Sequence, residues 1–252
     1  MSFDKCTFFR PIFSVWSFGL TLGLIFSFAL GGCSSSSTPR GSLSISNLEQ
    51  TRSEARLAKA VEVYRTMISS TDSGVPEALL QRSQCIVIMP EVLKAAFFAG
   101  GRIGKGIATC RASDNKNDKK WTPPTFMRLS SASIGLQVGA QSTDLILFFI
   151  GDSARESLLK NNITLGADVA VAAGPVGRSA EGKTDFSKTG IYAYAQNQGL
   201  FLGASVEGAS LTADRKANRA VYGSEVSHAN LLNNRWRGGW LSNAKELAQL
   251  LP

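Results

Sequence analysis

The hydrophobic positions fall into three zones along the chain. Residues 11–38 carry no charge, and the positions from Ile12 to Leu30 are dominated by large apolar side chains. Beyond residue 44, apolar residues first recur at the three- and four-residue spacing of a helix. From residue 85 they occur in short runs punctuated by glycine. This order predicts a targeting or anchor segment, then an amphipathic helix, then a sheet.

The first zone has the layout of an exported protein. Lys5 and Arg10 precede the apolar core, which ends at the tetrapeptide Leu30-Gly31-Gly32-Cys33. This tetrapeptide resembles the lipobox of bacterial lipoproteins, so we expect Cys33 to receive a diacylglycerol and become the mature N-terminus. An uncleaved anchor helix with an incidental cysteine is the alternative, because the apolar stretch is long enough to span a bilayer.

This interpretation divides the chain into four parts. We expect a signal peptide over 1–32, a serine-rich flexible tether over 33–43, a folded domain over 44–223 and a C-terminal extension over 224–252. Ser34, directly after the cysteine, resembles the pattern of lipoproteins sent to the outer membrane. The expected location is therefore the bacterial cell envelope, with the domain lipid-anchored and facing the periplasm.

Helical spacing recurs at several places in the mature chain. The clearest case is the amphipathic stretch from Leu48 to Ile68, whose apolar residues are Leu57, Val61, Tyr64 and Ile68. Shorter helices are predicted at Pro76–Arg82, at Asp152–Lys160 with Asp152 or Ser153 as its cap, and at Asn243–Leu250.

The remaining apolar runs predict strands. Residues 85–89 form a buried strand closed by Pro90, and further runs cover 96–101, 106–110, 125–140, 144–150, 168–173, 190–195 and 200–206. The polar segment 111–124 is expected to be a loop between two strands. Glycine inside many of these runs indicates bends and close approaches. The expected fold is α+β, with a glycine-rich, curved antiparallel sheet, sandwich or barrel-like, flanked by N- and C-terminal helices.

Charge and composition narrow the function. Twenty-seven Lys and Arg against nineteen Asp and Glu give +8, and loss of residues 1–32 leaves +7, so the folded part itself favours anionic partners. His228 is the single histidine, which argues against most zinc catalysis.

The cysteines suggest an oxidising compartment. Cys6 leaves with the signal and Cys33 carries lipid, so Cys85 and Cys110 are the remaining pair. We expect a disulfide between them. Two separate buried thiols are the alternative.

The chain does not contain the residue spacing of the known catalytic and cofactor-binding motifs that we compared with it. Gly100–Gly106 lacks the glycine and the Ser or Thr of a Walker A loop, and no nucleophile elbow accompanies His228, which we expect to be exposed or capping. Asp144, Asp168 and Asp185 lack calcium-loop spacing. Trp236 and Trp240 suit either a bilayer interface or core packing. We expect no enzyme, no cofactor, no metal and no nucleic-acid partner.

Several segments in order resemble the SYLF-domain family of lipid-binding proteins. They are 94–106, 121–126, 133–144, 165–178, 199–208 and the pair Tyr222-Gly223. The resemblance implies a non-enzymatic lipid-binding module with a glycine-rich antiparallel core. Eukaryotic members bind phosphoinositides, partly through an N-terminal amphipathic helix, and some associate with actin. For an envelope protein, the ligand implied is anionic phospholipid.

Six cations are the candidate lipid-binding residues: Arg52, Arg56 and Lys59 on the amphipathic helix, and Lys94, Arg102 and Lys105 near the glycine-rich hairpin. Each could instead be a solvated surface charge. The alternative function is an envelope scaffold that binds a protein or a polysaccharide.

Overall fold

The computed structural model describes residues 45–69, 75–97, 99–112, 120–134, 139–174, 190–197 and 200–252. The expected signal peptide, the tether, Cys33 and Asp185 lie outside these ranges. No helix within the described ranges is long and apolar enough to cross a membrane. The helices are α1 (Ile45–Ser69), α2 (Glu77–Arg82), α3 (Gly151–Leu158), α4 (Arg215–Tyr222), α5 (His228–Leu232) and α6 (Ser242–Leu250).

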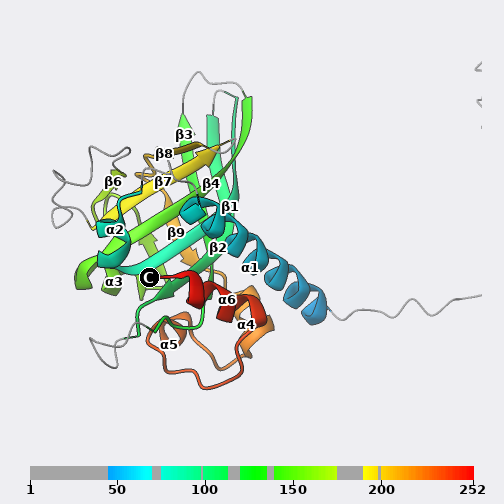
Figure 1. The fold of residues 1–252 in the computed structure, drawn as a ribbon. Coiled ribbons are helices and arrows are strands. Elements are labelled where there is room, and N and C mark those ends of the chain that lie inside the picture. Colours follow the sequence, from blue (N-terminus) through cyan, green and yellow to red (C-terminus); the bar gives the residue numbers. More distant parts are fainter. Residues whose placement is uncertain are drawn as a thin grey trace, which may run out of the picture. The chain divides into compact units, whose positions relative to one another are not determined.

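A single curled sheet organises the domain (Figure 1). Its strands are β1 (Ser83–Phe97), β2 (Ala99–Cys110), β3 (Thr125–Ile134), β4 (Gly139–Ile150), β5 (Asn162–Thr164), β6 (Val171–Ala173), β7 (Ile191–Asn197), β8 (Leu200–Gly203) and β9 (Ser210–Ala213). The strand order is β5-β9-β3-β2-β1-β4-β7-β6, and β8 also pairs with β7. All pairs are antiparallel except β6 with β7. The expected α+β class with a curved sheet is therefore confirmed.

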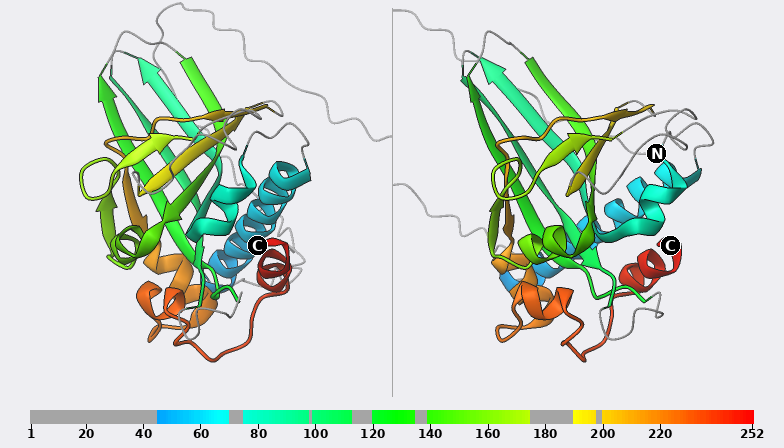
Figure 2. Two further views of the ribbon diagram at one scale, coloured as in Figure 1. Left: turned by 60° about the vertical axis from the view of Figure 1, so that its left-hand side comes forward. Right: turned by 90° about the vertical axis from the view of Figure 1, so that its left-hand side faces the viewer.

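Alternation along the strands divides the apolar side chains between two clusters. On one face, Ile86, Ile88, Ile107, Phe126 and Phe148 pack against α1, α2, α4 and α6. On the other face, residues from the middle and from both ends of the sheet meet α3, because the sheet curls into a half-barrel; they include Val87, Met127, Leu147, Ile163 and Ile191. Figure 2 shows this curl from two sides.

The last residues of the chain belong to the same core. Leu231, Leu247 and Leu251 join the helix-facing cluster, and the Arg111 and Trp121 side chains both donate hydrogen bonds to the carbonyl oxygen of Pro252. Both clusters are built from residues between Leu57 and Leu251. A chain that begins at Ser42 keeps all of their members, so we treat residues 42–252 as the folded unit in the experiments below.

A bulge carries β1 through Pro90, where the sequence predicted its end. Between Ile88 and Leu93 the pairing with β2 shifts register, and Glu91 has φ 51. Proline lacks the amide hydrogen that a regular ladder requires, and a bulge accommodates it. The runs predicted around Pro90 therefore belong to one long hairpin of β1 and β2.

Two other expectations need correction, and one helix lies where none was expected. The N-cap of α3 is Ile150, without a side-chain cap bond, so neither Asp152 nor Ser153 caps this helix. His228 is buried rather than exposed, at 5% exposure; its contact with the carbonyl oxygen of Leu158, the last residue of α3, agrees with the capping alternative. The helix α4, capped by Asp214, was not predicted.

The structure places Cys85 of β1 directly opposite Cys110 of β2. The two sulfur atoms form a disulfide, and both residues are fully buried. This bond ties the central hairpin together on the face of the sheet that meets α3.

Candidate functional site

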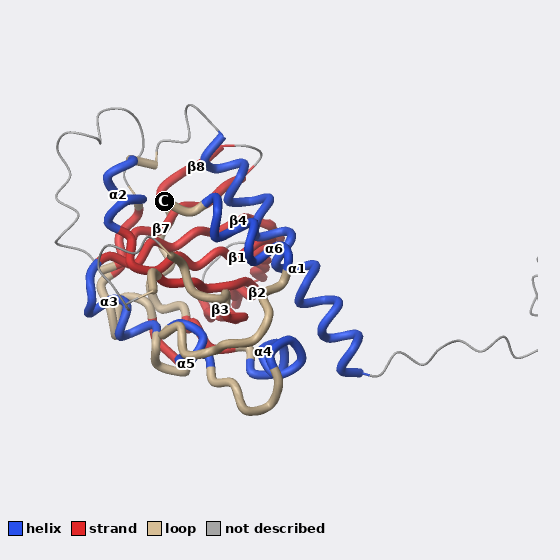
Figure 3. Tube along the Cα trace, turned by 60° about the horizontal axis from the view of Figure 1, so that its bottom comes forward, coloured by secondary structure: helices blue, strands red, loops and turns tan. Residues whose placement is uncertain are grey.

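A groove of about 710 Å³ lies between α1 and the outer part of strands β1, β2 and β3. The long helix crosses this face of the sheet in Figure 3. One wall is the stripe of α1 that carries Arg52, Ala55, Arg56 and Lys59. These positions share one side of the helix because they are three or four residues apart.

Positive charge dominates the lining. Five cations face one carboxylate, that of Glu91; the cations are Arg52, Arg56, Lys59, Lys105 and Arg128. Four of the six candidate lipid-binding residues therefore meet here. Arg128 joins them from a strand that sequence reasoning did not connect with the site.

Lys105 and Arg128 are the most informative pair. They lie directly opposite each other on β2 and β3, and both are exposed. Like charges opposite each other destabilise a sheet. Within the described parts of the chain, no carboxylate pairs with either residue. Among the described residues, the positive charge of this pair is therefore uncompensated.

The floor of the groove is apolar. Leu93 and Ile103 are cross-strand partners, 42% and 62% exposed. In the described chain, the other large exposed hydrophobic residues are Ile45 and Leu48, at the N-terminal end of α1. Exposed aliphatic side chains beside cations make a surface for an amphiphile.

Arg56 and Lys59 differ from the other cations of the groove. The Arg56 side chain is only 10% exposed, and its Nη1 lies 3.2 Å from Oδ2 of Asp214. Its Cζ lies 5.6 Å from the centroid of the Phe126 ring. Lys59 donates a hydrogen bond to Glu62, and this bond together with the Glu62 charge raises the pKa of Lys59. Arg56 therefore fixes α1 to the N-terminus of α4, while Lys59 stays charged.

The other two candidates lie on the opposite face. Side chains alternate along β2, so Arg102 points away from Ile103 and Lys105. Its Nη1 donates to the carbonyl oxygen of Ser205, at 2.8 Å. Lys94 is the cross-strand partner of Arg102 and shares its face. The structure does not bring these two residues to the groove.

The residues weighed for catalysis have structural contacts. His228 Nε2 lies 3.2 Å from the Leu158 carbonyl oxygen, and burial lowers the pKa of His228. Asp144 accepts from the Glu91 amide, and Asp168 from the Thr164 amide. Among the described residues, no group of three or more His, Cys, Asp or Glu could hold a metal ion.

The fold and the groove define a class of protein: an α+β domain whose curled sheet and long helix enclose a basic, partly apolar groove. A family model described as "Ysc84: Las17-binding protein actin regulator" matches residues 130–252. The chain belongs to this family, the Ysc84/SYLF family.

Relatives match over more of the chain. Protein YSC84 of Saccharomyces cerevisiae is 34% identical over 186 residues, which is 70% of this chain and 39% of that protein. LAS seventeen-binding protein 3 of the same species is 34% identical over 179 residues, 69% of this chain and 38% of that protein. The human SH3 domain-containing YSC84-like protein 1 is 31% identical over 186 residues, 72% of this chain and 53% of that protein. The matched part is therefore about half, or less, of these relatives.

Proposed function

We propose that the protein is a lipid-anchored cell-envelope protein whose SYLF domain binds anionic phospholipid in the groove between α1 and the sheet. The observation that carries the proposal is the uncompensated pair of Lys105 and Arg128 beside the exposed floor of Leu93 and Ile103. The protein has no catalytic role in this proposal.

The lining matches the two ends of a phospholipid. Phosphate oxygens accept charge-assisted hydrogen bonds from guanidinium and ammonium groups, which Arg52, Lys105 and Arg128 provide. The glycerol and the first methylenes of an acyl chain would cover Leu93 and Ile103, which removes apolar surface from water. A free inorganic anion would leave this apolar floor exposed.

The anchor is the second part of the proposal. Cys33 ends the tetrapeptide Leu30-Gly31-Gly32-Cys33 after an apolar core, and the proposed tether leads from there to α1. Replacement of Cys33 by Ser should leave an unprocessed precursor without diacylglycerol. Normal processing and acyl labelling of this variant would show that the anchor assignment is wrong.

Vesicle binding tests the groove. The folded unit, residues 42–252, is mixed with phosphatidylcholine vesicles with and without phosphatidylglycerol, and the bound fraction is measured by co-sedimentation. Each basic residue near an anionic surface contributes about 1 kcal/mol. The triple variant Arg52→Gln, Lys105→Gln, Arg128→Gln should therefore bind anionic vesicles roughly 100-fold more weakly.

A matched control keeps the change of net charge the same. Arg82→Gln, Lys160→Gln, Lys245→Gln removes three exposed cations that do not line the groove, and should bind nearly as the unmodified unit does. Added salt should weaken binding of the unmodified unit. Equal losses in both triple variants, or equal binding to neutral vesicles, would contradict the groove.

The names of the relatives favour a second candidate. They describe LAS seventeen binding and actin regulation, which are interactions with proteins. The corresponding proposal is an envelope scaffold whose basic groove holds an acidic segment of a protein, or a polysaccharide. This candidate replaces the first if the folded unit does not bind anionic vesicles.

A further inference from the structure

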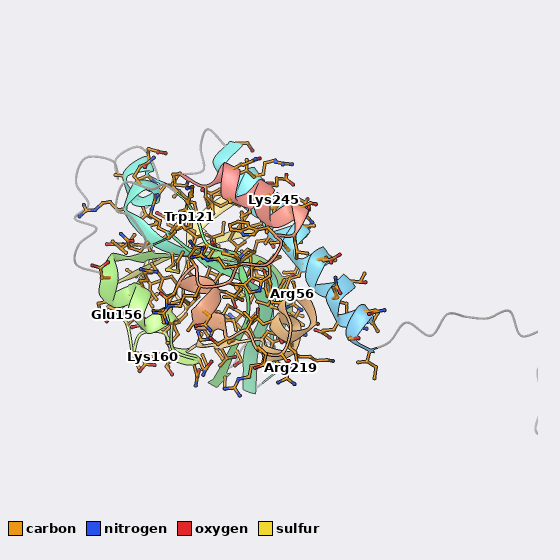
Figure 4. The ribbon with its side chains drawn as sticks, turned by 90° about the horizontal axis from the view of Figure 1, so that it is seen from below. Arg56, Trp121, Glu156, Lys160, Arg219 and Lys245 are labelled. Atoms are coloured by element: carbon orange, nitrogen blue, oxygen red, sulfur yellow. A yellow bond between two sulfur atoms is a disulfide. The ribbon has the colours of Figure 1, made fainter. Side chains whose placement is uncertain are left out.

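The outward face of α4 is strongly basic. Its inner side is fixed by Ala217, Asn218 and Tyr222, which are buried. The opposite side presents Arg215, Lys216, Arg219 and Ala220, which together line one hollow. Figure 4 shows Arg219 at the rim of the molecule, whereas Arg56 lies further in.

The positions of Arg215 and Lys216 do not favour the helix. Arg215 and Lys216 occupy the first turn of the helix, where the helix dipole is positive, and this turn contains no acidic residue. The cap, Asp214, is already paired with Arg56. A cluster that breaks the local rule without a gain in the core indicates a binding role.

Only one of the three cations has a counter-ion. Lys216 pairs with Glu49 of α1, at 3.2 Å between Nζ and Oε2. No carboxylate in the described ranges pairs with Arg215 or Arg219, and both are exposed. These two guanidinium groups are therefore available to an anion from outside the domain.

Apolar surface lies next to them. A hollow of about 530 Å³ separates the outward face of α4 from the first turn of α1, and Ile45 lines it. Ile45 is 77% exposed. In Figures 1 and 3 the first turns of α1 project past the sheet beside α4. This hollow shares no lining residue with the groove.

In the proposed function, the lipid anchor brings this end of the domain toward a membrane. Ile45 lies twelve positions after Cys33, so an extended tether reaches at most about 40 Å from the proposed lipid anchor. The outward face of α4 thus stands at the end of the domain that is closest along the chain to the bilayer. Its charge is complementary to an anionic leaflet.

We infer that the outward face of α4, together with Ile45, is a second lipid site that docks the domain on the surface of an anionic phospholipid bilayer. This inference rests on the proposed function, in which the groove holds a single lipid molecule. The groove then recognises one lipid, and α4 contacts the headgroup layer and sets the orientation of the domain.

Two lipid probes separate the two sites. Dihexanoyl phosphatidylglycerol below its micelle concentration offers single molecules, and phosphatidylcholine vesicles with phosphatidylglycerol offer a surface. Arg215→Gln with Arg219→Gln should weaken vesicle binding roughly 10- to 30-fold, but single-lipid binding by less than about twofold. The groove triple variant should weaken both. Lys160→Gln with Lys245→Gln is the control of equal charge, and should leave both within about threefold.

Amide hydrogen exchange shows directly which residues contact the vesicle surface. Vesicles should slow exchange of the amides of 215–222 in the unmodified unit, and the single-molecule lipid should not. Unchanged vesicle binding in the α4 pair variant, an equal loss with both probes, or absence of protection on vesicles would each overturn the inference. Failure of the proposed function gives a different result. In that case the single-molecule lipid does not bind, or it binds the groove triple variant as strongly as the unmodified unit. Urea unfolding midpoints confirm that each variant is folded.

Discussion

The ion pair of Arg56 with Asp214 should be a main determinant of stability, and Asp214→Asn tests it. The pair joins α1 to the N-terminus of α4 across 158 positions of sequence. Asp214 also accepts a hydrogen bond from the Ala217 amide as the cap of α4. Asparagine is an equally good cap, so this variant removes the charge and preserves the cap.

Burial sets the magnitude. The side chains of Arg56 and Asp214 are 10% and 4% exposed, so the charge left behind on Arg56 has little access to water. Breaking a buried pair from one side costs about 3–5 kcal/mol. The contact of Arg56 with the Phe126 ring remains and stabilises the cation a little. We expect a loss of about 3 kcal/mol.

Urea unfolding of residues 42–252 measures the loss. The series comprises Asp214→Asn, Arg56→Met and the double variant. Because Arg56→Met removes the cation that Asp214→Asn would leave unpaired, the double variant should lose at least about 2 kcal/mol less than the sum of the single changes. Lys59→Gln is the control: it removes an exposed pair with Glu62 and should cost less than about 0.5 kcal/mol.

A loss below about 1 kcal/mol for Asp214→Asn would refute the stabilising role of this ion pair. So would a double variant whose loss of unfolding free energy equals the sum of the two single losses. The result also bears on the groove. Asp214 already neutralises Arg56. We therefore expect Arg56→Met to weaken vesicle binding only in proportion to the fraction of the variant that is unfolded. An equally stable Arg56→Met unit with much weaker binding would instead make Arg56 a lipid ligand.

Three further changes test other parts of the fold. Burial lowers the pKa of His228, so below about pH 6.5 the unfolded chain takes up a proton that the folded chain does not. Stability, measured by urea unfolding, should therefore fall as the pH drops below about 6.5, and it should fall less in His228→Gln. Equal slopes in the two proteins would contradict this. Thiol titration of the denatured, unreduced unit should find neither Cys85 nor Cys110 free, and two reactive thiols would show that the disulfide is absent. Replacement of both cysteines by alanine should lower the free energy of unfolding by about 3–4 kcal/mol. A Cβ on Gly106 would lie 2.0 Å from the Ile88 carbonyl oxygen, so Gly106→Ala should cost about 3 kcal/mol in urea unfolding, and a loss below about 1 kcal/mol would show that the hairpin can adjust.

The sequence was most informative where one local pattern decided the structure. Helical spacing from Leu57 to Tyr64 predicted α1, because the same residues that repeat in the sequence pack on the sheet. The closing helix followed from the same reasoning. Helix α4 was missed, although its Asp214 cap and the terminal Gly223 were readable signals, because Val221 and Tyr222 are the only large apolar side chains among its eight residues.

The candidate site depended on information that a single sequence does not contain. One part could have been predicted: Arg102 and Lys105 are three positions apart on β2, so alternation alone places them on opposite faces. The contribution of Arg128 depends on the register between β2 and β3, which is set by the whole sheet. No pattern in the sequence indicates that Arg56 has Asp214 as its distant partner.

The bulge in β1 links the fold to the proposed site. From Ile88 to Leu93 the chain advances five positions, while its partner strand advances four, from Ile107 back to Ile103. The extra residue reverses the alternation, so Leu93 faces the same side as Ile88 and Ile103. Without this bulge, Leu93 would point to the opposite face and the floor of the groove would lose half of its exposed apolar pair. Pro90 and Glu91, which form the bulge, also line the groove. The irregularity that sequence reasoning took for the end of a strand is thus the feature that shapes the candidate lipid site.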